Sequence, residues 1–304
     1  MSRQKQALIT SRDDKGRHAV NLFAIEYDKA KLDKTGAQRL NEHGNELQAG
    51  IAKIIAELSV SNRFADEEAE SSYTYPDEYK GPKPISDQIK ALAKVLELSP
   101  AKALKYVKEV LPALELPNEA EGWFAIPSID AMAKKHFSHV TDPAAQYCLA
   151  VQLIHEKIGK SRSFYNYREG KILPDRLRTH VRTVEMLKQV AETQPGDILI
   201  IAGQLGMKHR GKSVRRARET FAGNEFGLNS LAVGSIILTH PERLVRYDEL
   251  DMDCAGDEFA PVAGSDFSRA PYFRFDDGRA EFGAGTVDSF YGYFGSASAF
   301  LPQS

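Results

Sequence analysis

The chain has 304 residues, 42% of them hydrophobic and 27% charged, which is typical of a folded protein with one large core or two ordinary ones. Its apolar runs are too short to span a membrane and its first ten residues lack the apolar core of a signal peptide, so we expect a cytoplasmic protein without a membrane partner. Cys148 and Cys254 lie outside any CxxC or Cys/His series, so neither a disulfide framework nor a structural zinc site is indicated.

The charge is unevenly distributed along the chain. Residues 160–218 carry fourteen Lys and Arg against five acids, a net charge of +9, and residues 219–304 carry five Arg against fourteen acids, a net charge of −9. Such neighbouring segments either neutralise each other across an internal contact or give the protein a basic and an acidic side. The sequence leaves both arrangements open.

The first predicted domain spans residues 1–61. Residues 17–27 have the β-branched and aromatic content of a strand, with Val20, Leu22 and Ala24 on one face, and residues 29–59 have the apolar spacing of helices. A strand followed by two helices is typical of a ribbon-helix-helix, but this strand face is too apolar to read base edges. Residues 62–84, rich in acids and prolines, are a predicted linker.

Residues 85–116 are predicted to form a helical hairpin, whose second helix starts with Ser99 as N-cap and Pro100 at its first position. The pair resembles a helix-turn-helix, in which the lysines of the second helix, Lys102, Lys105 and Lys108, would meet phosphates. It departs from that pattern at Glu97, where the turn usually has Gly, and at Ala103, where a larger apolar residue is usual. A plain αα-hairpin explains the same residues.

Residues 117–304 are predicted to form a mixed α/β domain with a β-rich tail. A short strand is expected at 121–127, helices at 128–137, 142–158 and 177–193, a buried apolar segment at 227–238, and a hairpin turn at Asp277-Gly278. Arg178 and Arg182 would form an i, i+4 pair on the third of these helices. The segment 161–171 interleaves aromatic and cationic side chains, a pattern that suits single-stranded nucleic acid or an exposed loop that packs its own aromatics.

The strongest functional signal is the basic stretch that follows an apolar strand at 197–202. Ser213 is a plausible N-cap of a helix that begins at Val214, so a positive helix end would lie among cations. Such a place binds anions, and a phosphodiester backbone is the ligand we expect there. The candidate phosphate contacts are Lys208, Arg210, Lys212, Ser213, Arg215, Arg216 and Arg218, helped by Arg178, Arg182, Lys102 and Lys105.

The segment 206–213 reads G-x-x-x-x-G-K-S and resembles the phosphate loop of the P-loop nucleotidases. The resemblance would make Lys212 the β/γ-phosphate contact and Ser213 a magnesium ligand. The loop is bulkier than such loops usually are, and too few residues follow for the parallel strands of that fold.

The acidic segment 247–258 offers a second candidate site. Asp251 and Asp253 share one side if the segment is a strand, and two carboxylates on one strand could hold a divalent metal or form a solvated acidic edge. The calcium-loop pattern fails at Ala255 and Val262. The histidines have no ligand spacing, and no metal or cofactor is predicted.

These observations predict an α+β protein with a helical N-terminal half and a mixed C-terminal domain ending in an antiparallel β-sheet. The leading functional hypothesis is a non-enzymatic nucleic-acid-binding protein, with DNA favoured weakly over RNA. The alternatives are a phosphoryl-transfer or hydrolytic enzyme that uses Lys212 and Ser213 or Asp251 and Asp253, and a structural scaffold. The oligomeric state stays open, a homo-oligomer included.

Overall fold

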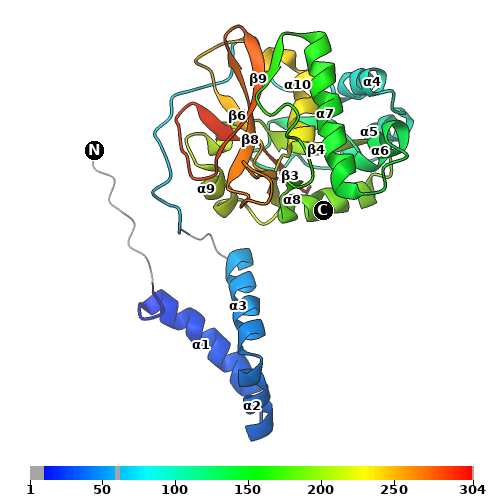
Figure 1. Ribbon diagram of the computed structural model, residues 1–304. Helices are drawn as coiled ribbons and strands as arrows, with labels where there is room; N and C mark the ends of the chain where they lie inside the picture. The colour runs from blue at the N-terminus through cyan, green and yellow to red at the C-terminus, as the bar shows by residue number, and fades with distance from the viewer. Residues whose placement is uncertain (1–9, 59–61, 303–304) are drawn as a thin grey trace. The chain divides into compact units, whose positions relative to one another are not determined.

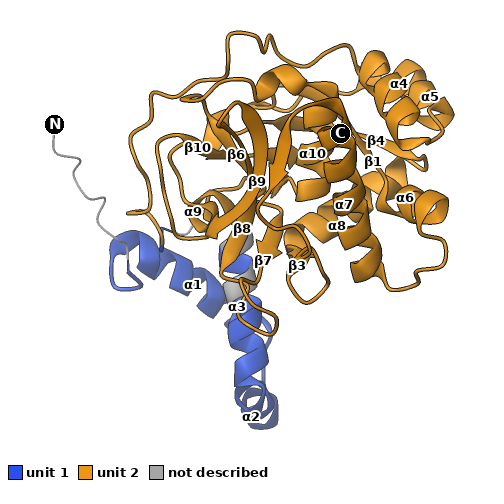
Figure 2. Ribbon diagram, turned by 45° about the horizontal axis from the view of Figure 1, so that its top comes forward, with its two compact units in different colours: residues 1–63 blue, residues 64–304 orange. Residues whose placement is uncertain are grey.

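The computed structural model describes residues 10–58 and 62–302 and contains two compact units, Met1–Arg63 and Phe64–Ser304 (Figures 1 and 2). Helices and strands both contribute substantially, and the sheets are antiparallel and mixed, which confirms the predicted α+β class. No helix within the described ranges has the length and apolar character needed to cross a bilayer.

The first unit is helical, with α1 at Asp14–Lys29, α2 at Lys34–Glu42 and α3 at Gly44–Leu58. The strand predicted at 17–27 is therefore wrong, because those residues lie within α1. A helix satisfies its backbone hydrogen bonds internally, whereas a strand needs a partner, and no strand is found among the described residues of this unit. The helices predicted at 29–59 are confirmed as α2 and α3, which meet at His43 and Gly44.

The second unit begins with an extended segment, 64–84, that the sequence predicts as a linker. It forms neither helix nor regular strand, yet its backbone bonds to distant parts of the unit, for example from Ala69 N to Gly211 O (2.7 Å) and from Leu250 N to Thr74 O (2.9 Å). We call residues 64–84 the strap, because they lie along the rest of the second unit and bond to it. The strap carries acids and tyrosines to that unit's surface and interior.

Seven α-helices and three short 3₁₀ helices are found between residues 85 and 243. The two predicted helices of the hairpin are confirmed, and Glu97 takes the left-handed conformation (φ 54°) at the end of the first, where glycine is usual. The bounds are α4 Ile85–Leu96, α5 Ala101–Glu109, η1 Leu111–Ala113, α6 Ile129–His136, α7 Pro143–Ser161, α8 Val181–Thr193, η2 Met207–His209, α9 Val214–Glu219, α10 Ser230–Thr239 and η3 Pro241–Arg243.

Helix α8 starts later than predicted. Leu177 and Arg178 belong instead to a short strand that pairs with residues 257–259, so Arg178 and Arg182 do not share a helix. The apolar spacing of 177–193 predicts Val181, Val184 and Val190 on the core side, but Val181 and Val184 are exposed and Val190 alone of the three is buried. Strand pairing and packing outweigh the apolar spacing at this end of the helix.

Two sheets form the rest of the second unit. The first is antiparallel, in the order β1 (Gly122–Pro127), β4 (Ile198–Gln204), β11 (Ser298–Phe300) and β5 (Glu225–Gly227). The second is mixed, in the order β10 (Phe294–Ser296), β6 (Asp251–Asp253), β8 (Arg269–Asp276), β7 (Asp257–Phe259) and β3 (Leu177–Thr179), with β9 (Arg279–Thr286) paired to β8 and to β2 (Phe164–Asn166). The β10–β6 and β2–β9 pairs are parallel.

Helix α10 is the centre of the core. Nine of its ten residues are buried, and it packs against α7, β1, α4 and β8 (Figure 1). The predicted hairpin turn is confirmed, because Asp277 and Gly278 both have positive φ between the paired Asp276 and Arg279. In β8 and β9 one face packs on this core through Phe273 and Phe282, which leaves the opposite face for other uses.

Candidate functional site

The glycine-containing loop 206–213 lies close to other backbone segments. Gly206 is packed against Gly295 and Gly211 against Ala69, so that a Cβ at either glycine would overlap a carbonyl oxygen. The backbone N–H groups along the loop donate to acceptors inside the protein; Ser213 N donates to Glu67 O (3.0 Å) and Gly211 N to Phe294 O (2.8 Å). The loop is thus engaged with the strap and β10 and forms no open cradle of N–H groups like that of a phosphate loop.

Acids of the strap neutralise the cations at the start of α9. The Nε atom of Arg215 donates to Glu67 (2.8 Å), and Arg216 bonds Glu68 (2.6 Å) and Glu219 (2.8 Å). Ser213 caps the helix, as predicted, by accepting from Arg216 N, and its hydroxyl donates to Glu67. The helix end that was predicted to bind phosphate therefore holds carboxylates from its own chain.

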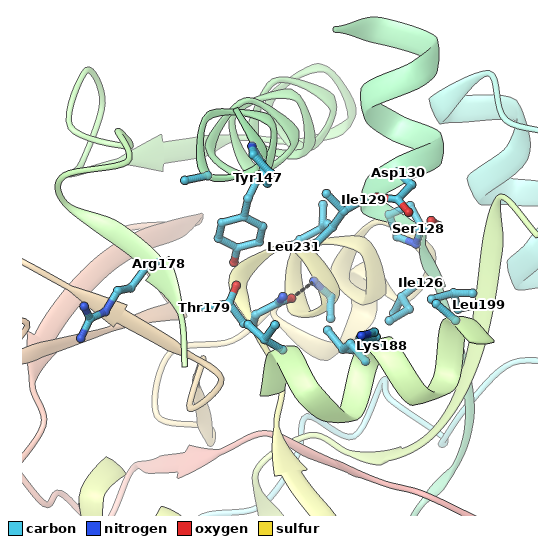
Figure 3. Close-up of a pocket in the computed structure, with 18 of the residues that line it drawn as sticks. Ile126, Ser128, Ile129, Asp130, Tyr147, Arg178, Thr179, Lys188, Leu199 and Leu231 are labelled. Atoms are coloured by element: carbon cyan, nitrogen blue, oxygen red, sulfur yellow. Dashed lines mark hydrogen bonds between the residues drawn. The ribbon is translucent and has the colours of Figure 1, made fainter. Parts of the chain in front are cut away.

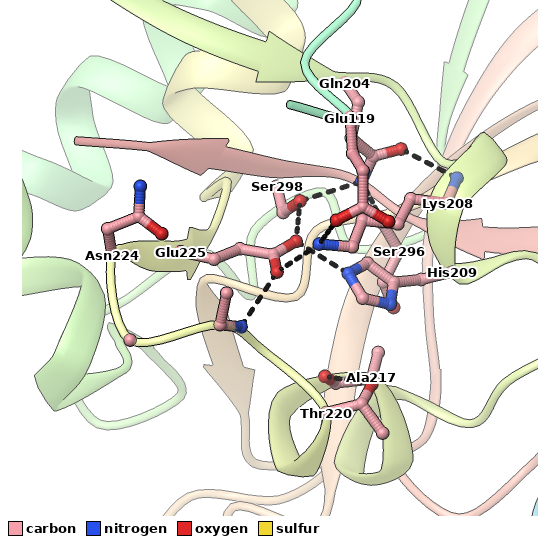
Figure 4. A network of polar contacts seen from close by, with 12 residues as sticks. Glu119, Gln204, Lys208, His209, Ala217, Thr220, Asn224, Glu225, Ser296 and Ser298 are labelled. Atoms are coloured by element: carbon pink, nitrogen blue, oxygen red, sulfur yellow. Dashed lines mark hydrogen bonds and ion pairs between the residues drawn. The ribbon is translucent and has the colours of Figure 1, made fainter. Parts of the chain in front are cut away.

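Glu225 organises a second group of predicted contacts, shown in Figure 4. Its carboxylate is fully buried and accepts from Lys208 Nζ (2.8 Å), His209 Nε2 (2.7 Å) and Ser298 Oγ (2.6 Å). Lys208 also pairs with Glu119 (2.6 Å). Burial raises the pKa of Glu225, but the bonds from His209, Lys208 and Ser298 outweigh it and lower the pKa to about 2. This network is an internal structural unit.

The other predicted contacts are dispersed. Arg218 is largely buried and bonds the carbonyls of Ala255 and Asp257, and Arg178 pairs with Glu258 (2.8 Å). The remaining five bond carbonyl or hydroxyl oxygens or lie exposed: Arg210 on Tyr73 O, Lys212 on Thr220 Oγ1, Arg182 on Gly223 O, and Lys102 and Lys105 on the surface of α5. The fold therefore does not gather the predicted set into one cationic face.

The second sheet does gather the two predicted carboxylates. Asp251 and Asp253 lie on one face of β6, while Met252 between them is buried in the core. A strand advances about 3.3 Å per residue, so the two Cα atoms lie roughly 6.5 Å apart. In the described part of the chain neither carboxyl has an ion pair, in contrast to the neutralised acids of the strap, and the carboxyl of Asp251 accepts from the backbone of Phe275.

Each carboxyl lines its own cavity, and the two cavities adjoin. Asp253 lines one of about 320 Å³ and Asp251 one of about 210 Å³, and Arg274 and Tyr293 line both. Tyr272, Tyr291 and Phe294 add aromatic walls to the first, and Tyr73 and Tyr247 add them to the second. The open face of the sheet thus presents a carboxyl pair at the centre of an aromatic-lined depression.

Burial raises the pKa of both carboxyls. The pKa of Asp253 rises to about 7, although the charge of Arg218 opposes the rise. The pKa of Asp251 rises well above its usual range by burial; Arg243 and Arg274 oppose that rise and the charge of Asp253 adds to it. Both carboxyls therefore hold a proton more readily than an ordinary aspartate, and because different charges surround them the two groups differ in what they can do with a proton.

Tyr272 lines the cavity of Asp253. Its ring lies across Gly283 of the neighbouring strand, where a Cβ would fall within 3 Å of ring carbons. The ring also contacts Phe294 edge to face at 5.2 Å. Strand alternation about the 277–278 turn places Tyr272, Arg274 and Glu281 on one face, and this alternation is the signal in the sequence that could have found them.

A larger cavity of about 460 Å³ lies elsewhere, between α6, α7, α8 and α10 (Figure 3). Its walls are mainly apolar, and Tyr147 and Thr179 lie at its inner end with their hydroxyl ends turned toward each other. Tyr147 donates to the carboxylate of Asp257 (2.6 and 2.7 Å), which also accepts from Ser230 N (2.7 Å). Burial raises the pKa of Asp257 to about 6, but its oxygens are already engaged. This cavity therefore offers space but few free polar groups.

Within the described residues no group of three or more His, Cys, Asp or Glu side chains is arranged to hold a metal ion. Comparisons of the chain with protein-family models, with curated proteins and with solved structures give no match. The carboxyl pair of β6 is thus the candidate site on the strength of its own geometry.

Proposed function

We propose that this protein is a hydrolytic enzyme that cleaves glycosidic bonds, with Asp251 as general acid and Asp253 as general base. The observation that carries the proposal is the pair itself: two carboxyls on one strand face, free of ion-pair partners in the described part of the chain, at the junction of two aromatic-lined cavities. Desolvated carboxyls without an ion-pair partner cost stability, which is expected where they serve chemistry.

The raised pKa values support different roles for the two groups. Asp251, whose pKa burial raises well above its usual range, is the group that would give a proton to the oxygen of a leaving group. Asp253, with a pKa of about 7, is partly ionised and can accept a proton from an attacking water. Glycoside hydrolysis needs this combination of one protonated and one ionised carboxyl.

The spacing supports inversion at the cleaved carbon. Inverting glycosidases place their carboxyls roughly 6.5 to 9.5 Å apart to leave room for a water, and retaining ones about 5 to 5.5 Å. Residues two apart on a strand lie roughly 6.5 Å apart at their Cα atoms, and side chains that extend from one face without contacting each other leave room for a water between the carboxyls. The scissile bond would lie near Arg274 and Tyr293, with a sugar in each cavity.

The surrounding side chains suit a sugar. Pyranose rings present C–H groups on their faces and hydroxyls at their edges, so they pack on aromatic rings while bonding carboxyl and guanidinium groups. Arg274 is held by Glu281 (2.9 Å from its Nε) and Asp276 (3.0 Å), which neutralises it and leaves an ordered polar wall. A largely neutralised face of this kind favours a hydroxyl-rich ligand over a dense polyanion.

The nucleic-acid interface predicted from the basic stretch remains a second proposal with less support. What favours it is the row of exposed lysines on α5, Lys102, Lys105 and Lys108, in a helix pair that resembles a helix-turn-helix. The pairing of Lys208, Arg215 and Arg216 with acids weighs against a role for residues 206–218.

The test is hydrolysis of a panel of neutral and acidic oligosaccharides by the purified full chain between pH 5 and 8, measured as new reducing ends. Asp251→Asn and Asp253→Asn should each lose activity while staying folded, and Asp266→Asn, a change at an exposed aspartate, should keep it. Where a product forms, its anomeric configuration by NMR should be inverted. Activity retained in both Asn variants of the pair would refute the assignment.

A further inference from the structure

Two arginines lie close together beside the cavity that Asp253 lines. Arg168, which follows β2, and Arg269, the first residue of β8, both donate to the carbonyl oxygen of Ala284, at 3.0 and 3.4 Å. Two guanidinium groups bonded to the same oxygen lie close together, within reach of a single anion. They come from segments about one hundred residues apart, so only the fold of the second sheet brings them together.

This pair is not neutralised. No carboxylate of the described residues pairs with Arg168 or Arg269, whereas Arg274 and Arg279 on the same sheet both bond Glu281 (2.9 and 3.0 Å). Burial, and then the charge of Arg269, lower the pKa of Arg168. The Nε atom of Arg168 is buried without a hydrogen-bond partner. Like charges held together with donors unused are unfavourable unless an anion joins them.

The cavity connects Arg269 to the candidate catalytic groups, and Arg168 lies at its edge, bonded to the carbonyl oxygen of the lining residue Ala284. Arg269 lines the 320 Å³ cavity together with Asp253, Tyr272 and Tyr291. An anionic group bonded to the arginines would therefore belong to a ligand that lies on Tyr272 and reaches Asp253. Guanidinium groups bind carboxylates with paired, coplanar hydrogen bonds, which suits one anionic group at a defined position.

We propose that Arg168 and Arg269 form a carboxylate-binding subsite, so that the sugar held in this cavity is a uronic acid or another carboxylate-bearing sugar. The inference rests on the proposed glycosidase function and specifies its substrate class. A nucleic acid fits the same observations less well, because a phosphate backbone needs a track of free cations and the neighbouring arginines of this face are paired with acids.

The experiment measures binding separately from turnover. Asp253→Asn, in which hydrolysis is blocked, is titrated calorimetrically with a glucuronate-containing oligosaccharide and with the same oligosaccharide after reduction of its carboxyl to the alcohol. We expect the acidic form to bind at least about tenfold tighter, with a preference that weakens as salt rises. Adding Arg269→Gln or Arg168→Gln should abolish the preference, and Arg269→Lys should restore part of it.

The controls keep the outcomes distinct. Arg269→Gln removes one of two like charges, so its melting temperature should match or exceed that of the parent, and Arg279→Gln, which alters a paired arginine, should leave the preference intact. Equal binding of both oligosaccharides, or a preference that survives Arg269→Gln, would overturn the subsite. Tighter binding of single-stranded DNA that Arg269→Gln removes would overturn the sugar assignment. If the unaltered protein hydrolyses the reduced oligosaccharide as fast as the acidic one, the carboxylate subsite is wrong and the glycosidase function stands. If the protein binds the acidic oligosaccharide selectively but hydrolyses no substrate, the glycosidase function is wrong and the subsite stands.

Discussion

Asp251 and Asp253 share one face of β6 while Met252 between them is fully buried on the other. The alternation of a strand makes this arrangement obligatory, and the core contact of Met252 fixes which face carries the carboxyls. Because burial raises the pKa of both groups, the pair lowers the stability of the protein at neutral and alkaline pH. Activity and stability should therefore respond in opposite directions when the pair is changed.

Asp253→Asn should abolish hydrolysis and stabilise the fold at high pH. The pKa of Asp253 is about 7 in the folded protein and about 3.8 when unperturbed, so the folded state binds the proton more tightly, and stability falls as pH rises from about 4 to 7. The variant does not lose stability in this way, so at pH 8 its free energy of unfolding should exceed that of the parent by up to a few kcal/mol. Thermal unfolding at pH 4 and pH 8 measures it; an equal pH dependence in both proteins would contradict the assignment.

The activity of the unaltered protein should depend on pH as a bell. The rate, as kcat/KM, should rise through about pH 7 as Asp253 ionises, and the basic limb should report the loss of the proton from Asp251, whose pKa burial raises. Arg218 lowers the pKa of Asp253, so Arg218→Gln should move the acidic limb to higher pH. A profile measured on the most rapidly cleaved oligosaccharide checks both statements, and an acidic limb that stays in place would argue against Asp253 as the base.

Gly283→Ala should deform the cavity that Asp253 and Tyr272 line. Its Cβ would overlap the ring of Tyr272, which must move from its position between β9 and Phe294, at an overpacking cost of about 1 to 3 kcal/mol. Gly159→Ala is the control, because its Cβ would meet nothing within 4 Å and the residue lies in α7, outside this cavity. Substrate affinity should fall in the first variant and persist in the second; equal affinities would show that Tyr272 is not part of the binding surface.

Replacing Arg215 and Arg216 together by Ala should destabilise the protein without changing its affinity for DNA. Arg216 holds Glu68 and the nearly buried Glu219, so its loss should cost about 3 kcal/mol, and the more exposed Arg215 should add less. Unfolding measurements and a salt series of DNA binding separate the two effects. A folded variant whose salt slope falls by about two units would instead support the predicted nucleic-acid interface.

Glu225→Gln should weaken the fold and remove part of its acid sensitivity. The pKa of Glu225 is about 2 in the folded state and about 4.5 when unperturbed, so this group contributes stability that is fully present above pH 4.5 and is lost as pH falls toward 2. Gln also leaves Lys208 without its buried partner. The difference in unfolding free energy between variant and parent should be smaller at pH 3 than at pH 7. A difference that is the same at both pH values would contradict the linkage.

The local elements were largely predictable from the sequence. Ser213 caps α9, Asp142 caps α7 by accepting from Ala144 and Ala145, and Asp277-Gly278 turns the β8–β9 hairpin, because each depends on interactions within a few residues. Two wrong predictions have physical causes as well. Residues 17–27 have the composition of a strand but lie in a helix without a strand partner, and Leu177, predicted to begin a helix, pairs with a strand about eighty residues further along the chain.

The site was predictable only in part. That Asp251 and Asp253 share a side follows from the two-residue period of a strand and needs no tertiary information. Whether they are solvated, paired or buried depends on what covers them, and the cavities around them are built by Tyr73 of the strap, Tyr272 of β8 and Tyr293 before β10.

The α+β class, the helix caps, the hairpin turn and the relation between neighbouring aspartates could all be predicted from the residues alone, since these follow from periodicity and local hydrogen bonding. Only the tertiary structure decided which charges are free. The strap brings Glu67 and Glu68 onto Arg215 and Arg216, whereas β2, β8 and β9 bring Arg168 beside Arg269 with no acid between them. The physical reason is that ion pairing and desolvation depend on distances of a few ångströms between residues far apart in the chain, which a one-dimensional pattern of charges does not contain.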